Sequence, residues 1–240
     1  TPMNSSAASD VYKRQGFLGF LEVHSSNYTK GYKTTVKNEL VADAFIPGMY
    51  IMLKKQESVE LISDGTPVSN KIYTNTVSGL GGVRVKAQVT NIEENDLVNG
   101  LSQNTSFGYD AFGNPTSISV GNGVETVTTN SSYTTFGTWW IPSRLASKTV
   151  YNSRAGEPAI IRSTDYTYSS LGDVKKEVKF PGTSQQKTTS YYHDPFGNVK
   201  RIIVSASGEP SMSNQRVYDG KGRFVIEEKN PLYQVTTTTV

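Results

Sequence analysis

The sequence of 240 residues contains no cysteine and only two histidines. The absence of cysteine excludes a disulfide framework, a thiolate zinc site and a cysteine nucleophile. His24 and His193 are too few for a zinc site unless carboxylates complete it. No apolar run approaches the ~20 residues with which a helix spans a bilayer, and no basic-then-apolar signal segment begins the chain.

Apolar residues are also scarce. They make up 35% of the chain, whereas tyrosine (14) and glycine (21) are abundant. This composition favours strands and turns over helices, so we expect an all-β protein with very little helix. The 24 basic and 21 acidic residues are spread along the chain and give a net charge of +3. The sequence has no basic tract of the kind that would predict a nucleic-acid surface.

The N-terminal residues have an unusual origin. Residues 5–15 match, codon by codon, the reading-frame translation of a transposase sequencing adaptor. Such segments are set aside before a fold is argued. We therefore interpret residues 1–15 as an assembly artefact of a metagenomic fragment and predict that they are disordered. The biological sequence is expected to begin near Gly16.

Residues 16–106 are expected to form a strand-rich segment. Residues 59–63 and 71–74 flank a turn sequence and predict a hairpin. Apolar and polar residues alternate over 83–89, which is the period of a half-buried strand. At the other end of the chain, the Thr-rich residues 234–240 predict a further strand.

The stretch around Asp194 predicts two strands joined by a tight turn. Asp194 suits the first position of a type I turn, Pro195 presets φ at the second, and Gly197 suits the fourth. The arrangement recurs with tyrosine before it and asparagine or arginine after the glycine. The predicted structural residues of the four turns are Tyr109, Asp110, Gly113 and Asn114; Tyr168 and Gly172; Tyr192, Asp194, Gly197 and Asn198; and Tyr218, Asp219, Gly222 and Arg223.

The spacing of these turns indicates an array. Gly172, Gly197 and Gly222 lie 25 residues apart, and Gly113 lies 59 residues before Gly172. A fixed spacing indicates a repeated structural unit. We therefore predict a repeat array over residues 107–240, with an aromatic insertion at 131–162 and a truncated C-terminal end.

The turn motif resembles that of the Rhs, or YD-repeat, family of very large bacterial secreted and surface proteins. This family includes polymorphic toxins and the B and C components of insecticidal toxin complexes. Its signature is Tyr-Asp, two variable residues, Gly, then Asn or Arg, which the Tyr109 and Tyr218 copies match fully. The central copy has His193 in place of tyrosine, and the Tyr168 copy lacks the aspartate.

The resemblance implies a fold and a function. In that family, antiparallel hairpin repeats form a curved strip that closes into a hollow β-shell around a C-terminal toxin polypeptide. The expected partners are therefore the remaining repeats of the same chain and the enclosed toxin, and the expected location is secreted or on the bacterial cell surface. The family's self-cleaving core has no match here, so no catalytic residue, metal or cofactor is predicted, and the segment is expected to be a non-enzymatic part of the shell.

Two alternatives follow from the residues themselves. Trp139 and Trp140 could form a stacking platform, which would make the chain a cell-surface array that binds carbohydrates or neighbouring cells. Oxygen ligands for calcium recur at the turns, on Asp110, Asn114, Asp194, Asn198 and Asp219. Local hydrogen bonding within the turns explains these side chains better than a metal does. A strand role likewise explains His193 better than catalysis does.

Overall fold

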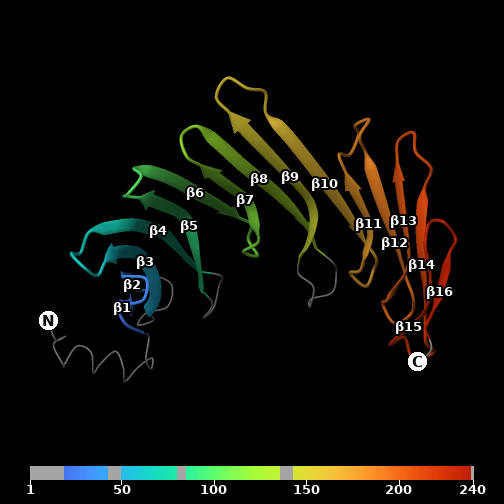
Figure 1. Cartoon of the computed structure of the whole chain (residues 1–240), viewed down its shortest axis with the longest axis horizontal. Coiled ribbons are helices and arrows are strands. Elements are labelled where there is room, and N and C mark those ends of the chain that lie inside the picture. The colour runs from blue at the N-terminus through green and yellow to red at the C-terminus, as the bar shows by residue number, and fades with distance from the viewer. Residues whose placement is uncertain (1–18, 43–49, 80–84, 136–142, 239–240) are drawn as a thin grey trace. The chain divides into compact units, whose positions relative to one another are not determined.

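A computed structural model describes residues 19–42, 50–79, 85–135 and 143–238, and within them the chain forms sixteen strands and no helix (Figure 1). The strands are β1 (Glu22–Asn27), β2 (Tyr32–Ala42), β3 (Tyr50–Leu61), β4 (Pro67–Gly79), β5 (Val85–Asp96), β6 (Leu101–Tyr109), β7 (Pro115–Gly121), β8 (Glu125–Thr134), β9 (Arg144–Arg154), β10 (Ile160–Tyr168), β11 (Val174–Lys179), β12 (Lys187–His193), β13 (Val199–Ala206), β14 (Met212–Tyr218), β15 (Val225–Lys229) and β16 (Val235–Thr237). The predicted all-β class is confirmed.

The chain divides into two compact units. The first comprises the residues up to Tyr109 together with Ser117–Thr126, and the second comprises Asp110–Thr116 together with Val127–Val240. In the first unit β1 to β6 pair antiparallel in chain order. In the second unit β9 to β16 do the same, and Figure 1 shows them side by side. Every pair is therefore formed by sequence neighbours, as hairpin repeats require.

Several predicted segments lie where the sequence places them. The hairpin expected from 59–63 and 71–74 is formed by β3 and β4. Of the strand expected over 83–89, residues 85–89 form the start of β5, and residues 83 and 84 lie outside the described part of the chain. Part of the predicted strand at 234–240 is β16. Residues 1–15 lie outside the described part of the chain.

The sheet has almost no interior. Among the described residues no side chain is fully buried, and Thr35, 9% exposed, is the most enclosed polar residue. No helix of the described residues covers either face. Because a single hairpin is marginal in water, each hairpin depends on its neighbours for stability. The contacts between successive turns therefore matter more than a core does.

Candidate functional site

The Asp194 turn has the predicted geometry. The Gly197 N–H donates to the Asp194 carbonyl at 3.1 Å, and the Asp194 N–H donates to the Asn198 carbonyl at 2.9 Å. Gly197 has a φ of +87°, which a side chain would strain. A type I turn followed by a left-handed residue is a common three-residue hairpin loop, and it is this glycine that closes it.

The Asp194 carboxylate is fully engaged inside its own turn. Oδ1 accepts from the Phe196 and Asn198 N–H groups, both at 2.9 Å, and Oδ2 accepts from Asn198 Nδ2 at 3.1 Å. Desolvation, the largest single influence, raises the pKa of this carboxyl, but the bonds from Asn198 and Phe196 together outweigh it. They hold the pKa below its ordinary value of 3.8.

The Asp110 turn repeats this arrangement closely. Asp110 Oδ1 accepts from the Phe112 and Asn114 N–H groups, both at 2.9 Å, and Oδ2 accepts from Asn114 Nδ2 at 2.8 Å. Desolvation raises the pKa of the Asp110 carboxyl, but the hydrogen bonds from Asn114 and Phe112 outweigh it, so the pKa lies below its ordinary value. Both carboxylates are thus explained by the turn itself.

The Tyr168 copy reaches the same geometry with different side chains. Ser169 Oγ accepts from the Leu171 N–H at 3.2 Å and from the Asp173 N–H at 3.1 Å. The hydroxyl in turn donates to Asp173 Oδ2 at 3.2 Å. The acid has moved from the first to the last position of the turn, and Gly172 still closes it. The missing aspartate is therefore replaced rather than lost.

The Tyr218 copy is one residue longer. The Asp219 N–H donates to the carbonyl of Phe224, and Asp219 Oδ1 accepts from the Arg223 and Phe224 N–H groups. The backbone bond from Arg223 is the main reason that the pKa of Asp219 is lowered; desolvation opposes it. Arg223 Nη2 also lies 3.6 Å from Asp219 Oδ2, so an ion pair takes the place of the amide hydrogen bond that asparagine makes in the Asp110 and Asp194 turns.

A tyrosine at or near the end of several strands is bonded to the strand before it. The hydroxyl donates to a backbone carbonyl near the start of the preceding strand, in the pairs Tyr109–Val89 (2.8 Å), Tyr133–Pro115 (2.9 Å), Tyr168–Leu145 (2.7 Å) and Tyr218–Val199 (3.2 Å). We call Tyr109, Tyr133, Tyr168 and Tyr218 the edge tyrosines. Val199 directly follows the Asp194 turn and Tyr218 directly precedes the Asp219 turn, so this bond links two consecutive turns.

Tyr133 was not recognised as a repeat residue from the sequence. It stands 24 residues after Tyr109, and Phe136-Gly137 follows it as Phe112-Gly113 follows Tyr109. That spacing is the signal that could have placed it in the array rather than in an aromatic cluster alone.

Tyr192 and His193 lie outside the edge-tyrosine series. Tyr192 is 47% exposed, with the Arg201 guanidinium 5.9 Å from its ring centre. His193 occupies the repeat's tyrosine position, and no hydrogen bond of its side chain is recorded among the described residues. This turn therefore lacks the bond to the preceding strand.

Consecutive turns also contact each other directly. Asn198 Nδ2 donates to the Gly222 carbonyl at 2.8 Å, and Asn114 Nδ2 donates to Ser143 Oγ at 2.7 Å. A Cβ at Gly222 would come within 2.6 Å of the Phe196 ring, and its φ is +68°. Gly222 is thus required both by its own turn and by the turn before it.

One turn of this class was missed. The Asn230 N–H donates to the Gln234 carbonyl at 3.1 Å, and Asn230 Oδ1 accepts from the Leu232 and Gln234 N–H groups, both at 3.0 Å. Tyr233 occupies the closing position with a φ of +64°. This turn has neither a Tyr-Asp pair nor a glycine. The signal that remained in the sequence is its start, Asn230-Pro231, which matches the Asp194-Pro195 start of the central turn.

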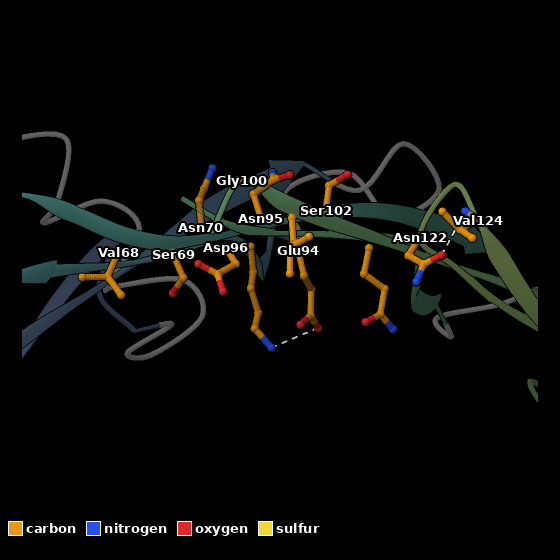
Figure 2. Close-up of a pocket in the computed structure, with 13 residues that line it drawn as sticks. Val68, Ser69, Asn70, Glu94, Asn95, Asp96, Gly100, Ser102, Asn122 and Val124 are labelled. Atoms are coloured by element: carbon orange, nitrogen blue, oxygen red, sulfur yellow. Dashed lines mark hydrogen bonds and ion pairs between the residues drawn. The ribbon is translucent and has the colours of Figure 1, made fainter. Parts of the chain in front are cut away.

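The groove drawn in Figure 2 has a volume of about 580 Å³ and lies in the first unit, over β4, β5 and β6. Its charged groups are already paired, since Lys71 Nζ lies 3.0 Å from Glu94 Oε1. Asp96 accepts from the backbone of the next turn, and Asn122 does the same in its own turn. The groove therefore offers few unsatisfied groups to a ligand.

The remaining predicted candidates give no catalytic arrangement. Trp139 and Trp140 lie outside the described residues. His24 Nδ1 lies 3.0 Å from Thr35 Oγ1, and its Nε2 lies 3.4 Å from Glu22 Oε1, on an exposed strand. Over the described ranges, no group of three or more His, Asp or Glu side chains is placed to hold a metal ion. Nor do those ranges contain a helix that is long and apolar enough to cross a membrane.

Comparison with known proteins gives distant structural likenesses, two of which are described here. No protein-family model and no curated protein sequence matches this chain. A crystal structure of TcdB2–TccC3–Cdc42 matches with 12% identity and a TM-score of 0.35, over 87% of this chain and 13% of that one. A porin-like protein from Bacteroides uniformis matches with 8% identity and a TM-score of 0.22, over 80% of this chain and 92% of that one. Neither likeness assigns a family.

Proposed function

We propose that this chain is a non-enzymatic wall segment of a larger β-shell, in a secreted or surface-located bacterial protein of the Rhs/YD-repeat type. Its partners would be further repeats of the same protein and a toxin polypeptide that the shell encloses or presents. The observation that carries the proposal is the use made of the predicted site residues. Asp110 and Asp194 are engaged within their turns, and the edge tyrosines and Asn198 bind the neighbouring turns.

The exposure of the sheet supports the same proposal. No side chain is fully buried among the described residues, so the faces of these strands are open to contact with further parts of a larger protein. A sheet of consecutive hairpins that binds mainly to itself is suited to forming a wall, because identical contacts can be added at each repeat.

Protection of the enclosed polypeptide tests the shell. The complete open reading frame that encodes this chain would be expressed and treated with a broad-specificity protease, natively and after partial unfolding in urea. We expect a C-terminal polypeptide to survive in the native protein and to be digested once the wall is opened. Digestion at the rate of the same polypeptide expressed alone would overturn the proposal. Reproducible hydrolysis of a generic ester or glycoside by residues 1–240 would overturn its non-enzymatic part.

A further inference from the structure

The turn between β5 and β6 is held by an amide and a carboxylate. Asp96 is the last residue of β5, and its Oδ1 accepts from the Val98 and Asn99 N–H groups, both at 3.0 Å. Asn99 Nδ2 donates to Asp96 Oδ2 at 2.7 Å. This side-chain bond is also the largest influence that holds the pKa of Asp96 below its ordinary value. We call such an asparagine–aspartate pair an amide clamp.

Two of the repeat turns contain the same clamp. Asn114 Nδ2 donates to Asp110 Oδ2 at 2.8 Å, and Asn198 Nδ2 donates to Asp194 Oδ2 at 3.1 Å. In all three turns the neutral amide is the donor and the carboxylate is the acceptor, so each bond is charge-assisted. The three clamps are therefore alike as hydrogen bonds.

The clamps differ in the residue that follows the asparagine. An asparagine amide can be attacked by the backbone nitrogen of the next residue. Asn114 is followed by Pro115, which has no N–H to lose, and Asn198 is followed by Val199, whose branched side chain crowds the attack. Asn99 is followed by Gly100, which presents neither obstacle, and residues 97–100 are exposed to water. Only the clamp of the β5–β6 turn is therefore open to this chemistry.

We propose that Asn99 is a site of spontaneous deamidation, and that its modification opens the amide clamp of the β5–β6 turn. The Gly100 nitrogen forms a bond to Asn99 Cγ, the bond from Cγ to Nδ2 breaks, and the proton of the attacking nitrogen leaves with Nδ2 as ammonia. Water then opens the succinimide ring at either of its carbonyls, which leaves aspartate or isoaspartate at position 99. Water is the only co-reactant, and the proposal does not depend on the shell.

Either product ends the clamp. An aspartate replaces the Nδ2 donor with a second carboxylate, which only accepts hydrogen bonds and repels the first. An isoaspartate adds a carbon to the backbone and so changes the turn itself. The new charge lies beside Asp96, which with Gly100 lines the groove drawn in Figure 2. The β5–β6 hairpin is therefore expected to loosen as the protein ages.

Asn122 provides a matched control, because it is the only other asparagine in the sequence that a glycine follows. Its Oδ1 accepts from the Val124 and Glu125 N–H groups at 3.0 and 2.8 Å (Figure 2). Here the side chain serves as an acceptor, and an aspartate keeps an oxygen in that role. Asn122→Asp should therefore leave its turn intact, whereas Asn99→Asp should not.

Peptide mapping by mass spectrometry tests the reaction, on residues 1–240 held in mildly alkaline buffer. We expect Asn99 to convert to aspartate and isoaspartate before conversion of Asn114 or Asn198 is detectable. An Asn99 that stays intact, or conversion of all three asparagines at one rate, would overturn the proposal.

The variant Val199→Gly tests whether the following residue decides which clamp reacts. It removes the side chain that crowds Asn198 and keeps the carbonyl to which Tyr218 donates. Asn198 should then convert as Asn99 does. If Asn198 stays intact beside the new glycine while Asn99 converts, the following residue does not distinguish the clamps and the proposal fails.

Urea unfolding measures the consequence for the fold. Asn99→Asp should lower the urea midpoint by about 0.5 M, because a hydrogen bond to a charged group is lost and two like charges are brought together. Asn122→Asp should leave the midpoint nearly unchanged. Equal midpoints for the two variants would mean that the Asn99 amide does not hold the turn, which would also overturn the proposal.

Discussion

The two edges of the second unit are built differently. The turns after β10, β12 and β14 share one plan, in which a glycine closes the loop and the first residue accepts from backbone N–H groups. At the opposite strand ends the turns after β9 and β13 share a shorter plan, in which the Glu157 N–H donates to the Arg154 carbonyl and the Glu209 N–H donates to the Ala206 carbonyl. The turn after β15 follows the plan of the first edge, with Asn230 as its first residue and Tyr233 in place of the glycine.

Bonds between consecutive turns are found at the first of these edges. Asn198 donates to Gly222 in the next turn, and Tyr218 donates to Val199, which directly follows the Asp194 turn. We expect these turn-to-turn contacts to contribute to stability, and three changes test that expectation.

The largest effect is expected at Gly222, with Gly208 as the matched control. Both glycines have a positive φ, +68° and +78°, so alanine costs about 1–2 kcal/mol at either position. Only at Gly222 would the new Cβ meet a side chain, at 2.6 Å from Phe196. We expect Gly222→Ala to lower the free energy of unfolding by ~1–3 kcal/mol more than Gly208→Ala does, as measured by urea unfolding.

The double variant Gly222→Ala with Phe196→Ala sharpens this result. Removing the ring should recover much of the extra loss, since the two positions are in contact. Equal destabilisation by Gly222→Ala and Gly208→Ala would show that turn-to-turn packing has no part in stability.

A smaller effect is expected at an edge tyrosine. Tyr168→Phe removes the 2.7 Å bond to the Leu145 carbonyl and should cost about 1 kcal/mol in urea unfolding. Tyr192→Phe is the control, because no hydrogen bond of the Tyr192 hydroxyl is recorded among the described residues and its ring remains. If both variants unfold at the same urea concentration, the edge tyrosines do not hold the turns.

The smallest effect is a pH dependence from the turn carboxylates. The pKa of Asp194 is lowered in the folded chain, so the unfolded chain binds more protons below the ordinary 3.8. The stabilisation by this group is complete above that value and is lost as the pH falls through the lowered pKa. In urea midpoints measured from pH 6 to pH 2, Asp194→Asn should flatten the acid-side decline. An unchanged slope would mean that Asp194 titrates equally in both states.

Sequence reasoning reached the strands and the turns because their signals are local. A local backbone preference is imposed by each of Asp194, Pro195 and Gly197 at its own position. Alternation of apolar and polar residues over 83–89 predicts a strand whatever the neighbouring strand is. The class of fold followed from these signals together with the shortage of apolar residues.

The contacts between strands and turns could not be predicted from the sequence in the same way. That Tyr218 binds the Val199 carbonyl depends on the strand register and on the β-bulge between Val217 and Tyr218. The Asn230 turn could not be predicted because Tyr233 adopts a positive φ at the position that glycine occupies in the Asp110 and Asp194 turns.

The edge tyrosines carry a consequence for how the protein is made. Each one binds a carbonyl that lies earlier in the chain, by 18 to 23 residues. A ribosome delivers the chain from its N-terminus, so the acceptor carbonyl has always been synthesised before the tyrosine that needs it. Each emerging hairpin can therefore dock on a completed one, and the sheet can grow in step with translation, without waiting for distant segments.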